Sequence, residues 1–390
     1  MMLGFLLARA GVDVVVLEKH ADFLRDFRGD TIHPSTLEIM HELGILDGFL
    51  KLPHQKVSVL KAQFGDTSVT FADFTHLPTQ CKFLAFMPQW NFLNFIADRA
   101  AIYSTFHLRM SAEVTDLVEE AGLIAGVRVT TSNGPLEVRA NLVAGADGRG
   151  SLVREKAGLK VEEFGAPMDV LWLRLRRAPG DPEKTAGRLE VGHIFIMINR
   201  GNEWQLGFVI PKGESEQVRE QGMPAFRATL TKLAPFLSDR VSELRDWNDV
   251  KLLTVRVDRL SQWYRSGLLC IGDAAHAMSP VAGVGINLAI QDAVAAANIL
   301  AAPLREGRLT GGDLRQVQKR RAFPTRLTQS FQLAIQNRVI KHTLERRPLA
   351  RDTKKFGPPL IIRLVRRFPA IRRLNARLVG LGFRPEHVRI

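Results

Sequence analysis

The sequence predicts an α/β fold, and three features of the chain predict it. Two apolar runs, 12–17 and 142–146, have the length and composition of parallel strands buried on both faces, and each ends at an acidic residue. A third run, 268–271, ends at Gly272 and Asp273 and leads through a glycine-containing loop into a helix. Residues 56–86 instead alternate apolar and polar side chains, which indicates antiparallel strands with one wet face.

The first element expected is a helix over residues 3–10, ended by Gly11 and followed by the strand that ends at Glu18 and Lys19. Helix, strand and terminal glutamate match the second half of a Rossmann βαβ unit, where the acid holds the ribose hydroxyls of an adenine nucleotide. A solvated strand end is the alternative for Glu18. The first strand and the G-x-G-x-x-G turn of such a unit are not found, which leaves a misassigned start, a shortened chain or a lost phosphate loop open.

The segment 268–292 is expected to form a ligand-binding corner. Pro280, Gly283 and Gly285 make a loop that can bring backbone close to a ligand, and a helix with a small-residue face begins at Ile286. Asp273 lies at the carboxyl end of a strand, where its carboxylate can accept hydrogen bonds from sugar-like hydroxyls. The start of the following helix can stabilise a negative charge. An ordinary strand–turn–helix is the alternative.

This arrangement resembles the Gly-Asp motif of the flavin-dependent aromatic hydroxylases, the p-hydroxybenzoate hydroxylase-like monooxygenases. The resemblance implies that Asp273 binds the ribityl chain of FAD and that the segment 283–287 faces the flavin pyrimidine. A second stretch, Ala146-Asp147-Gly148 between an apolar strand and a helix capped by Ser151, resembles the Asp-Gly motif of the same family. That motif lies near the FAD pyrophosphate and the path of NAD(P)H.

Three further positions follow from the resemblance alone. It implies that Arg28 approaches the FAD phosphates or the flavin edge, that Gln89 contacts the ribityl chain, and that the backbone of Val114 touches adenine. A surface charge is the alternative for Arg28. The complete set of expected cofactor-binding residues is Glu18, Lys19, Arg28, Gln89, Val114, Asp147, Gly148, Asp273, Ala274, Pro280, Gly283, Gly285, Ile286 and Asn287.

The activity that the resemblance implies is that of an FAD-dependent monooxygenase. NAD(P)H would reduce FAD, and the reduced flavin would bind O₂ as a C4a-hydroperoxide that hydroxylates an aromatic or quinone-like small molecule. The sequence holds no catalytic triad, HExxH or CxxC motif, as expected where the cofactor carries the chemistry. Trp172, His193 and Trp204 are expected on the sheet that faces the flavin, as ordinary packing or as ligands. The alternatives are a flavin reductase of an isoprenoid-type substrate and a flavin-free remnant without its phosphate loop.

The chain is expected to divide into two domains and a tail. Residues 1–55, 87–167 and 256–340 would form the Rossmann-like FAD-binding domain with its parallel sheet. Residues 56–86 and 168–255, including a helix over 218–233, would form an antiparallel-sheet substrate domain. Residues 341–390 would form a basic helical C-terminal segment.

Net charge is +14, and most of it lies in that tail. Residues 341–390 hold 14 Lys or Arg and three acids, with an apolar stripe beside a basic face that Pro369 interrupts. A helix packed on its own protein is the favoured interpretation, peripheral contact with an anionic membrane comes next, and nucleic acid is not expected because no recognised motif accompanies the charge. Cys81 and Cys270 form no metal or redox motif, so we expect a cytoplasmic protein without a metal site. A homodimer is a further expectation.

Overall fold

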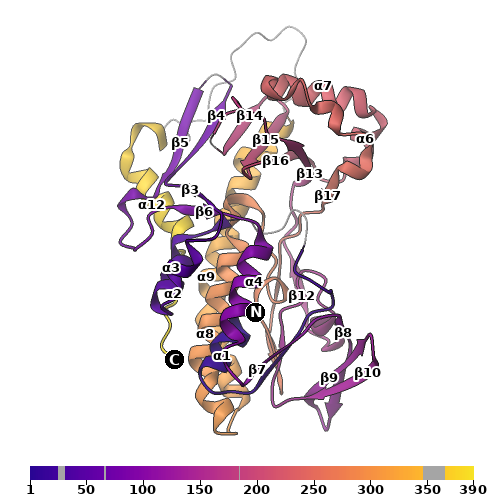
Figure 1. Ribbon diagram of the computed structural model, residues 1–390, viewed down its shortest axis with the longest axis vertical. Helices are drawn as coiled ribbons and strands as arrows, with labels where there is room; N and C mark the ends of the chain where they lie inside the picture. Colours follow the sequence, from indigo (N-terminus) through magenta and orange to yellow (C-terminus); the bar gives the residue numbers. More distant parts are fainter. Residues whose placement is uncertain (25–30, 66, 184, 346–364) are drawn as a thin grey trace.

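The computed structural model describes residues 1–24, 31–65, 67–183, 185–345 and 365–390 (Figure 1). It is a mixed α/β protein with parallel and antiparallel sheets and C-terminal helices, which confirms the predicted fold class. Two long helices, α8 (Gly285–Arg305) and α9 (Gly311–Ile335), run side by side through the middle of the molecule. A mainly antiparallel sheet lies at one end of these helices (Figure 1).

The parallel strands form two separate ladders. The expected strand after the first helix is β1 (Val14–Leu17), and it pairs in parallel with β7 (Phe106–Arg109). The two motif strands, β11 (Val143–Gly145) and β20 (Leu268–Cys270), pair in parallel with each other, and β19 (Tyr264–Arg265) adds to β20. Among the described residues, β1 and β11 are each paired on one side only, so the single parallel sheet that we expected is divided in two.

The main core lies between these strands and the helices. The chain begins with α1 (Met2–Arg9), which packs against α8 and against α4 (Gln89–Ala100). Gly4 allows α1 to approach β1, because a Cβ atom at this position would lie 2.7 Å from Val16 Cγ2. The small-residue face expected on α8 is buried here, since Ala293, Ala296 and Ala297 are at most 3% exposed.

A seven-stranded sheet joins two distant parts of the chain. Only its β14–β4 pair is parallel, and every other pair is antiparallel. Strands from 59–73 and from 168–253 belong to it, whereas β3 and β6 join β2 in a smaller sheet. The division of the chain into two domains remains a prediction. The seven strands, in sheet order, are β17 (Lys251–Leu253), β13 (Met168–Arg176), β16 (Glu203–Pro211), β15 (His193–Asn199), β14 (Ala186–Glu190), β4 (Val59–Phe64) and β5 (Thr67–Asp73).

The outer face of this sheet is covered by two helices rather than one. The expected helix over 218–233 is wrong as a single element, because Gly222 adopts φ +84° and breaks it. The result is α6 (Ser215–Glu220) followed by α7 (Met223–Leu233). Phe226 and Leu230 of α7 pack against the outward side chains of the sheet, so only the opposite face is left to line a cavity.

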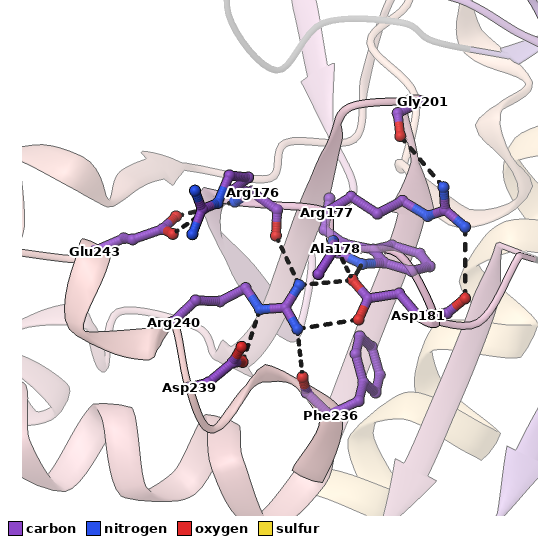
Figure 2. A network of polar contacts seen from close by, with 10 residues as sticks. Arg176, Arg177, Ala178, Asp181, Gly201, Phe236, Asp239, Arg240 and Glu243 are labelled. Carbon is purple, nitrogen blue, oxygen red and sulfur yellow. Dashed lines mark hydrogen bonds and ion pairs between the residues drawn. The ribbon is translucent and has the colours of Figure 1, made fainter.

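A buried ion pair fastens the outer face of the sheet to the turns beyond α7 (Figure 2). Arg240 donates two hydrogen bonds to the carboxylate of Asp181, at 2.8 and 3.0 Å, and a third to the carbonyl of Phe236 in η2 (Pro235–Leu237). Trp204 and the backbone N–H of Ala178 donate to the same carboxylate. Burial would raise the pKa of Asp181, but these hydrogen bonds and Arg240 outweigh it and lower that pKa. The pair is therefore fully hydrogen-bonded and acts as a structural anchor.

The break that the sequence predicted at Pro369 is present in the C-terminal segment. Residues 365–367 are helical, Phe368 is extended, and Pro369 begins α12 (Pro369–Gly380), where its missing N–H costs no helical hydrogen bond. α12 packs on β5 and on η1 (Phe74–His76), as the favoured interpretation of the tail predicts. The expected apolar positions 360–364 lie outside the described residues. The helix α10 (Lys341–Glu345) follows α9 through a single π-helical turn, η7 (Gln336–Ile340).

The remaining helices and strands connect these parts. They are β2 (Thr31–Ile32), α2 (Pro34–Glu42), α3 (Leu46–Phe49), β3 (Gln55–Val57), β6 (Leu84–Phe86), β8 (Ala112–Glu120), β9 (Leu123–Thr131), β10 (Gly134–Arg139), α5 (Leu152–Lys156), β12 (Val161–Glu163) and β18 (Asp258–Leu260).

Candidate cofactor and substrate site

One cavity of about 2720 Å³ extends from the parallel strands to the inner face of the seven-stranded sheet. Small-molecule sites typically occupy roughly 300–1,000 Å³, so this cavity has room for a dinucleotide and a second ring molecule. Most of the residues expected to bind a cofactor line it, although they come from six different parts of the chain. These are Glu18, Lys19, Gln89, Val114, Asp147, Gly148, Asp273, Pro280, Gly283, Gly285 and Ile286.

Three expected residues are not among the cavity-lining side chains. Arg28 lies outside the described residues. Ala274 is completely buried behind the loop. Asn287 is 3% exposed, and its side chain is used within the protein: Oδ1 accepts hydrogen bonds from the His33 N–H and the Thr36 hydroxyl, both at 2.8 Å, and Nδ2 donates to the Thr31 carbonyl at 2.9 Å. Its side chain therefore fixes the start of α8 to β2 and α2.

The two sequence motifs meet at the carboxyl ends of neighbouring strands. The β11–β20 register pairs Gly145 with Cys270, so the turns that follow the two strands open on the same side. The Asp147 carboxylate accepts hydrogen bonds from the Ser151 hydroxyl and the Val153 N–H and thereby begins α5. Across the gap, Arg149 donates to the Asp273 carboxylate at 3.1 Å.

Arg149 connects the two motifs through its side chain, and the sequence analysis assigned it no role. Its side chain is 29% exposed and lines the cavity beside Asp273, which is 32% exposed. The only sequence feature that could have indicated a role for this arginine is its position directly after Asp147-Gly148. A cation held between two carboxylate-bearing turns is suited to contact a phosphate group.

The loop between Asp273 and α8 has an unusual backbone at the cavity wall. Within η6 (Val281–Gly283), Ala282 adopts φ +63° and Gly283 adopts φ +61°. A Cβ atom on Gly283 would lie 2.9 Å from the Thr31 hydroxyl oxygen, so the loop passes closer to β2 than a side chain would permit. Such conformations are held in place by their surroundings, and they are common at binding sites.

Replacing Gly283 with alanine is expected to lower the free energy of unfolding by about 1–3 kcal/mol, because alanine is strained at positive φ and meets Thr31. The matched change is Gly285→Ala, where the nearest atom would be Met278 Cβ at 3.8 Å and φ is negative. Chemical denaturation of both variants measures the difference. Equal stability of the two variants would contradict the described path of the loop.

A buried polar cluster holds the other end of this loop from beneath. The Asp292 carboxylate accepts hydrogen bonds from the Gly272 N–H at 3.1 Å and from Arg321 Nε at 2.8 Å, and His276 Nε2 lies 2.6 Å away. Arg321 also donates to Glu386, which ties the C-terminal segment to the same cluster. Burial would raise the pKa of Asp292, but His276 and Arg321 outweigh it and hold the pKa below its ordinary range.

His33 lies on the opposite side of the same loop. Its backbone N–H donates to Asn287, and its ring Nδ1 donates to the Val379 carbonyl at 2.7 Å, an acceptor that requires the proton on Nδ1. Burial lowers the pKa of His33 to about 4, so the ring is neutral at neutral pH. It therefore connects the start of α8 with α12 as an uncharged donor.

Stability is expected to fall as pH decreases from about 6.5 towards about 4, because the unfolded chain then binds a proton that folded His33 excludes. The contribution of this one group over the whole interval is about 3 kcal/mol. In the His33→Gln variant, the side chain keeps an N–H donor but does not titrate. The unfolding free energy of this variant should therefore vary less with pH across this interval. The exposed His20→Gln serves as the control and should keep the wild-type pH profile. An unchanged profile in His33→Gln would contradict the assignment.

The residues present fit a flavin adenine dinucleotide. Within the described residues, neither α1 nor α8 has a side-chain cap at its N-terminus, and both ends lie at the cavity. Uncapped helix N-termini present free N–H groups to negative charge, as a diphosphate and a reduced flavin require. Glu18 follows β1, Asp273 follows β20, and both line the cavity, while their contacts with ribose and ribityl hydroxyls remain predictions.

The inner face of the seven-stranded sheet forms the apolar end of the cavity. Trp172 lines it and covers Gly207 on β16, where a Cβ atom would lie 3.0 Å from the indole ring. Trp204 and His193 lie in this sheet, as expected, but on its other face, because alternate residues of a strand point to opposite faces. Trp204 is buried on the outer face against Asp181, and the His193 ring lies beside Phe208, also on the outer face. The other lining side chains are Met168, Val170, Ile194, Ile196, Ile198, Val209, Ile335 and Val339.

Comparisons with known proteins identify similar sequences and folds. The family described as "FAD binding domain" matches residues 1–330. The 6-methylpretetramide 4-monooxygenase of Streptomyces rimosus is 31% identical over 345 residues, which cover 87% of this chain and 82% of that protein. The dialkyldecalin synthase of Streptomyces rugosporus is 29% identical over 75% of this chain, which spans 61% of that protein's length. Among solved structures, the anhydrotetracycline hydroxylase OxyS of Streptomyces rimosus has a TM-score of 0.76 at 23% identity, over 97% of this chain and 73% of that one.

Proposed function

The chain belongs to the FAD-dependent aromatic hydroxylases, the class A flavin monooxygenases with an FAD binding domain, and from this premise we propose that it uses NAD(P)H and O₂ to hydroxylate a multi-ring aromatic small molecule. One observation carries the proposal. The corner that holds Asp273 and the apolar face that holds Trp172 line a single cavity, so a flavin and a ring substrate would lie in contact.

Bound FAD supplies the redox chemistry of such a reaction, and the protein supplies binding, orientation and a dry environment. Glu18 and Asp273 would accept hydrogen bonds from the two sugar-like parts of the cofactor. The start of α8, held in place by Asn287, would stabilise negative charge on the flavin ring. The apolar sheet face and the turn η7 would exclude water from the reacting ring.

The substrate class is supported by the size and polarity of the cavity and by the names of relatives. Two similar proteins are named for 6-methylpretetramide and for anhydrotetracycline. The sheet end of the cavity offers mainly hydrocarbon side chains, which suit a flat ring system more than a small charged acid. The use of NAD(P)H is supported by the resemblance of the Asp147 turn to the Asp-Gly motif. A homodimer and a cytoplasmic location remain predictions, and both cysteines are free and buried.

The alternative functions differ from a hydroxylase in whether they consume coenzyme and oxygen. Neither the isoprenoid reductase nor the flavin-free remnant is supported by the relatives found. The dialkyldecalin synthase, however, is named for ring formation rather than hydroxylation, so the experiment must separate the two activities.

The test is turnover of purified, FAD-loaded protein with NADH or NADPH and a panel of multi-ring phenols and naphthoquinones. We expect a ring compound to accelerate coenzyme oxidation and to gain one oxygen atom from isotopically labelled O₂. Coenzyme oxidation with a hydrogenated product and no labelled oxygen would indicate a reductase. A rearranged product without coenzyme consumption would indicate a synthase. Either result would overturn the proposed hydroxylation.

A further inference from the structure

The outward side of α12 combines positive charge with exposed apolar side chains. Residues 365–385 contain six arginines and no aspartate or glutamate. Phe368, directly before the helix, is 50% exposed, and Leu374 within it is 55% exposed. Apolar and cationic side chains therefore occur together on this side of the helix.

The exposed positions of α12 lie along one side of the helix. Ala370, Arg373, Leu374 and Arg377 are all exposed, and their spacing of three and four residues places them above one another. Leu374 is therefore flanked by two guanidinium groups. Arg366 and Arg367 continue the same basic character at the start of the helix.

The inward side of α12 is already occupied. Asn375 donates a hydrogen bond to the Phe71 carbonyl at 3.1 Å, and Gly380 lies so close to η1 that a Cβ atom would be 3.0 Å from Leu77. Ile371 and Val379 face the substrate end of the cavity. Figure 1 shows α12 in yellow at the edge of the molecule, beside β5. Its anchored inner side leaves the outer side for another partner.

Among the described residues, the arginines on the outer side have few acidic neighbours. No acidic side chain in the described part of the chain forms an ion pair with Arg366, Arg367 or Arg377. The acid that faces Arg373 is Asp73, and its carboxylate already accepts hydrogen bonds from Thr75. The surface therefore offers several guanidinium groups to an external anion.

We propose that this outer side of α12 docks on an anionic phospholipid surface. Guanidinium groups bind lipid phosphates in a fork-shaped geometry, and Phe368 and Leu374 would enter the boundary between head groups and acyl chains. A nucleic acid would use the arginines but would leave Leu374 in water, so the exposed apolar residues favour a lipid. The inference does not depend on the proposed function, because it concerns only the outer surface of α12.

The test is co-sedimentation of FAD-loaded, full-length protein with vesicles of phosphatidylcholine alone or mixed with phosphatidylglycerol. We expect binding to the mixed vesicles, weak binding to the neutral ones, and a decrease in both affinity and bound fraction as salt is raised. Glycerol phosphate in solution should not displace the protein. Equal binding to both kinds of vesicle, or displacement by glycerol phosphate, would overturn the proposal.

Two double variants separate the contributions of the apolar side chains and of the arginines to vesicle binding. Phe368→Ser with Leu374→Ser should weaken vesicle binding about tenfold or more, through loss of the inserted apolar area. Arg373→Gln with Arg377→Gln should also weaken it about tenfold or more, since each basic residue near an anionic membrane contributes substantially. Undiminished vesicle binding by either double variant would overturn the proposal.

The matched control is Phe323→Ser with Arg326→Gln on α9, where Phe323 is 57% exposed and Arg326 is also exposed. This variant changes the same residue types at another surface and should bind vesicles like the wild type. Retained flavin absorbance in all variants shows that the fold is intact. A control variant that loses binding as much as the α12 variants would contradict a specific docking surface.

Discussion

Asp292→Ala is expected to destabilise the protein by about 3–5 kcal/mol, because it removes the buried carboxylate that Arg321 and His276 share and leaves Arg321 with Glu386 as its one remaining anion among the described residues. Asp292 and Arg321 are both 0% exposed, and the Gly272 N–H would lose its acceptor as well. The unfolding free energy from urea denaturation measures the effect. Since Gly272 precedes Asp273, the variant should also bind FAD more weakly.

The control for this variant is Asp239→Ala. Asp239 also pairs with a buried arginine, Arg240, but it is 68% exposed, and Arg240 keeps Asp181 as its main partner. Loss of such an exposed partner is expected to cost less than about 1 kcal/mol. Comparable stability of the Asp292 and Asp239 variants would contradict the role of the buried cluster.

The pH dependence of this cluster has a definite sign. The pKa of Asp292 is lower in the folded protein than in the unfolded chain. Its contribution to the free energy of unfolding is therefore fully present above the unfolded pKa, and it is lost as the pH falls through the folded pKa. Asp292→Ala should therefore lose less stability than the wild type on acidification. A wild-type slope in the variant would contradict the lowered pKa.

Asp273→Ala is expected to weaken FAD binding about 10- to 100-fold, the range that corresponds to loss of charge-assisted hydrogen bonds. Its effect on stability should be small, because Asp273 is about one-third exposed and pairs with the similarly exposed Arg149. Titration of the apoprotein with FAD, followed by quenching of flavin fluorescence, measures the affinity.

Asp273→Asn serves as the graded variant, since it keeps an acceptor oxygen but removes the charge. We expect its FAD affinity to lie between those of the wild type and the alanine variant. An unchanged affinity in Asp273→Ala would show that the cofactor does not use this carboxylate, and would remove the residue from the proposed site.

The turns at Asp147 and Asp273 could be predicted from the sequence, because the signals for each lie within one short segment. An apolar strand, an acid and a glycine turn are read within about ten residues, and the rule that ligands bind at the carboxyl ends of parallel strands then brings Asp147 and Asp273 to one side. The helix starts at Ser151 and near Ile286 follow from similarly local signals. Much of the cavity wall could therefore be predicted from the sequence alone.

The remaining features depend on contacts that no local pattern encodes. Arg321 reaches Asp292, and Glu386 reaches Arg321, from other parts of the chain, and their burial shows only in three dimensions. The direction of the Asn287 side chain was set by partners in β2 and α2, far away in sequence. The faces of Trp204 and His193 depended on strand register, where a shift by one residue reverses inside and outside.

The central claim is that flavin and ring substrate share one cavity, and absorbance spectroscopy of the flavin tests it most directly. FAD-loaded protein is titrated with a multi-ring aromatic ligand such as a hydroxyanthraquinone, and the visible flavin bands are recorded. The account predicts a saturable perturbation of the flavin spectrum, because the ring would lie against the isoalloxazine. Protein that takes up no FAD, or that binds the ring without any change in the flavin bands, would contradict it.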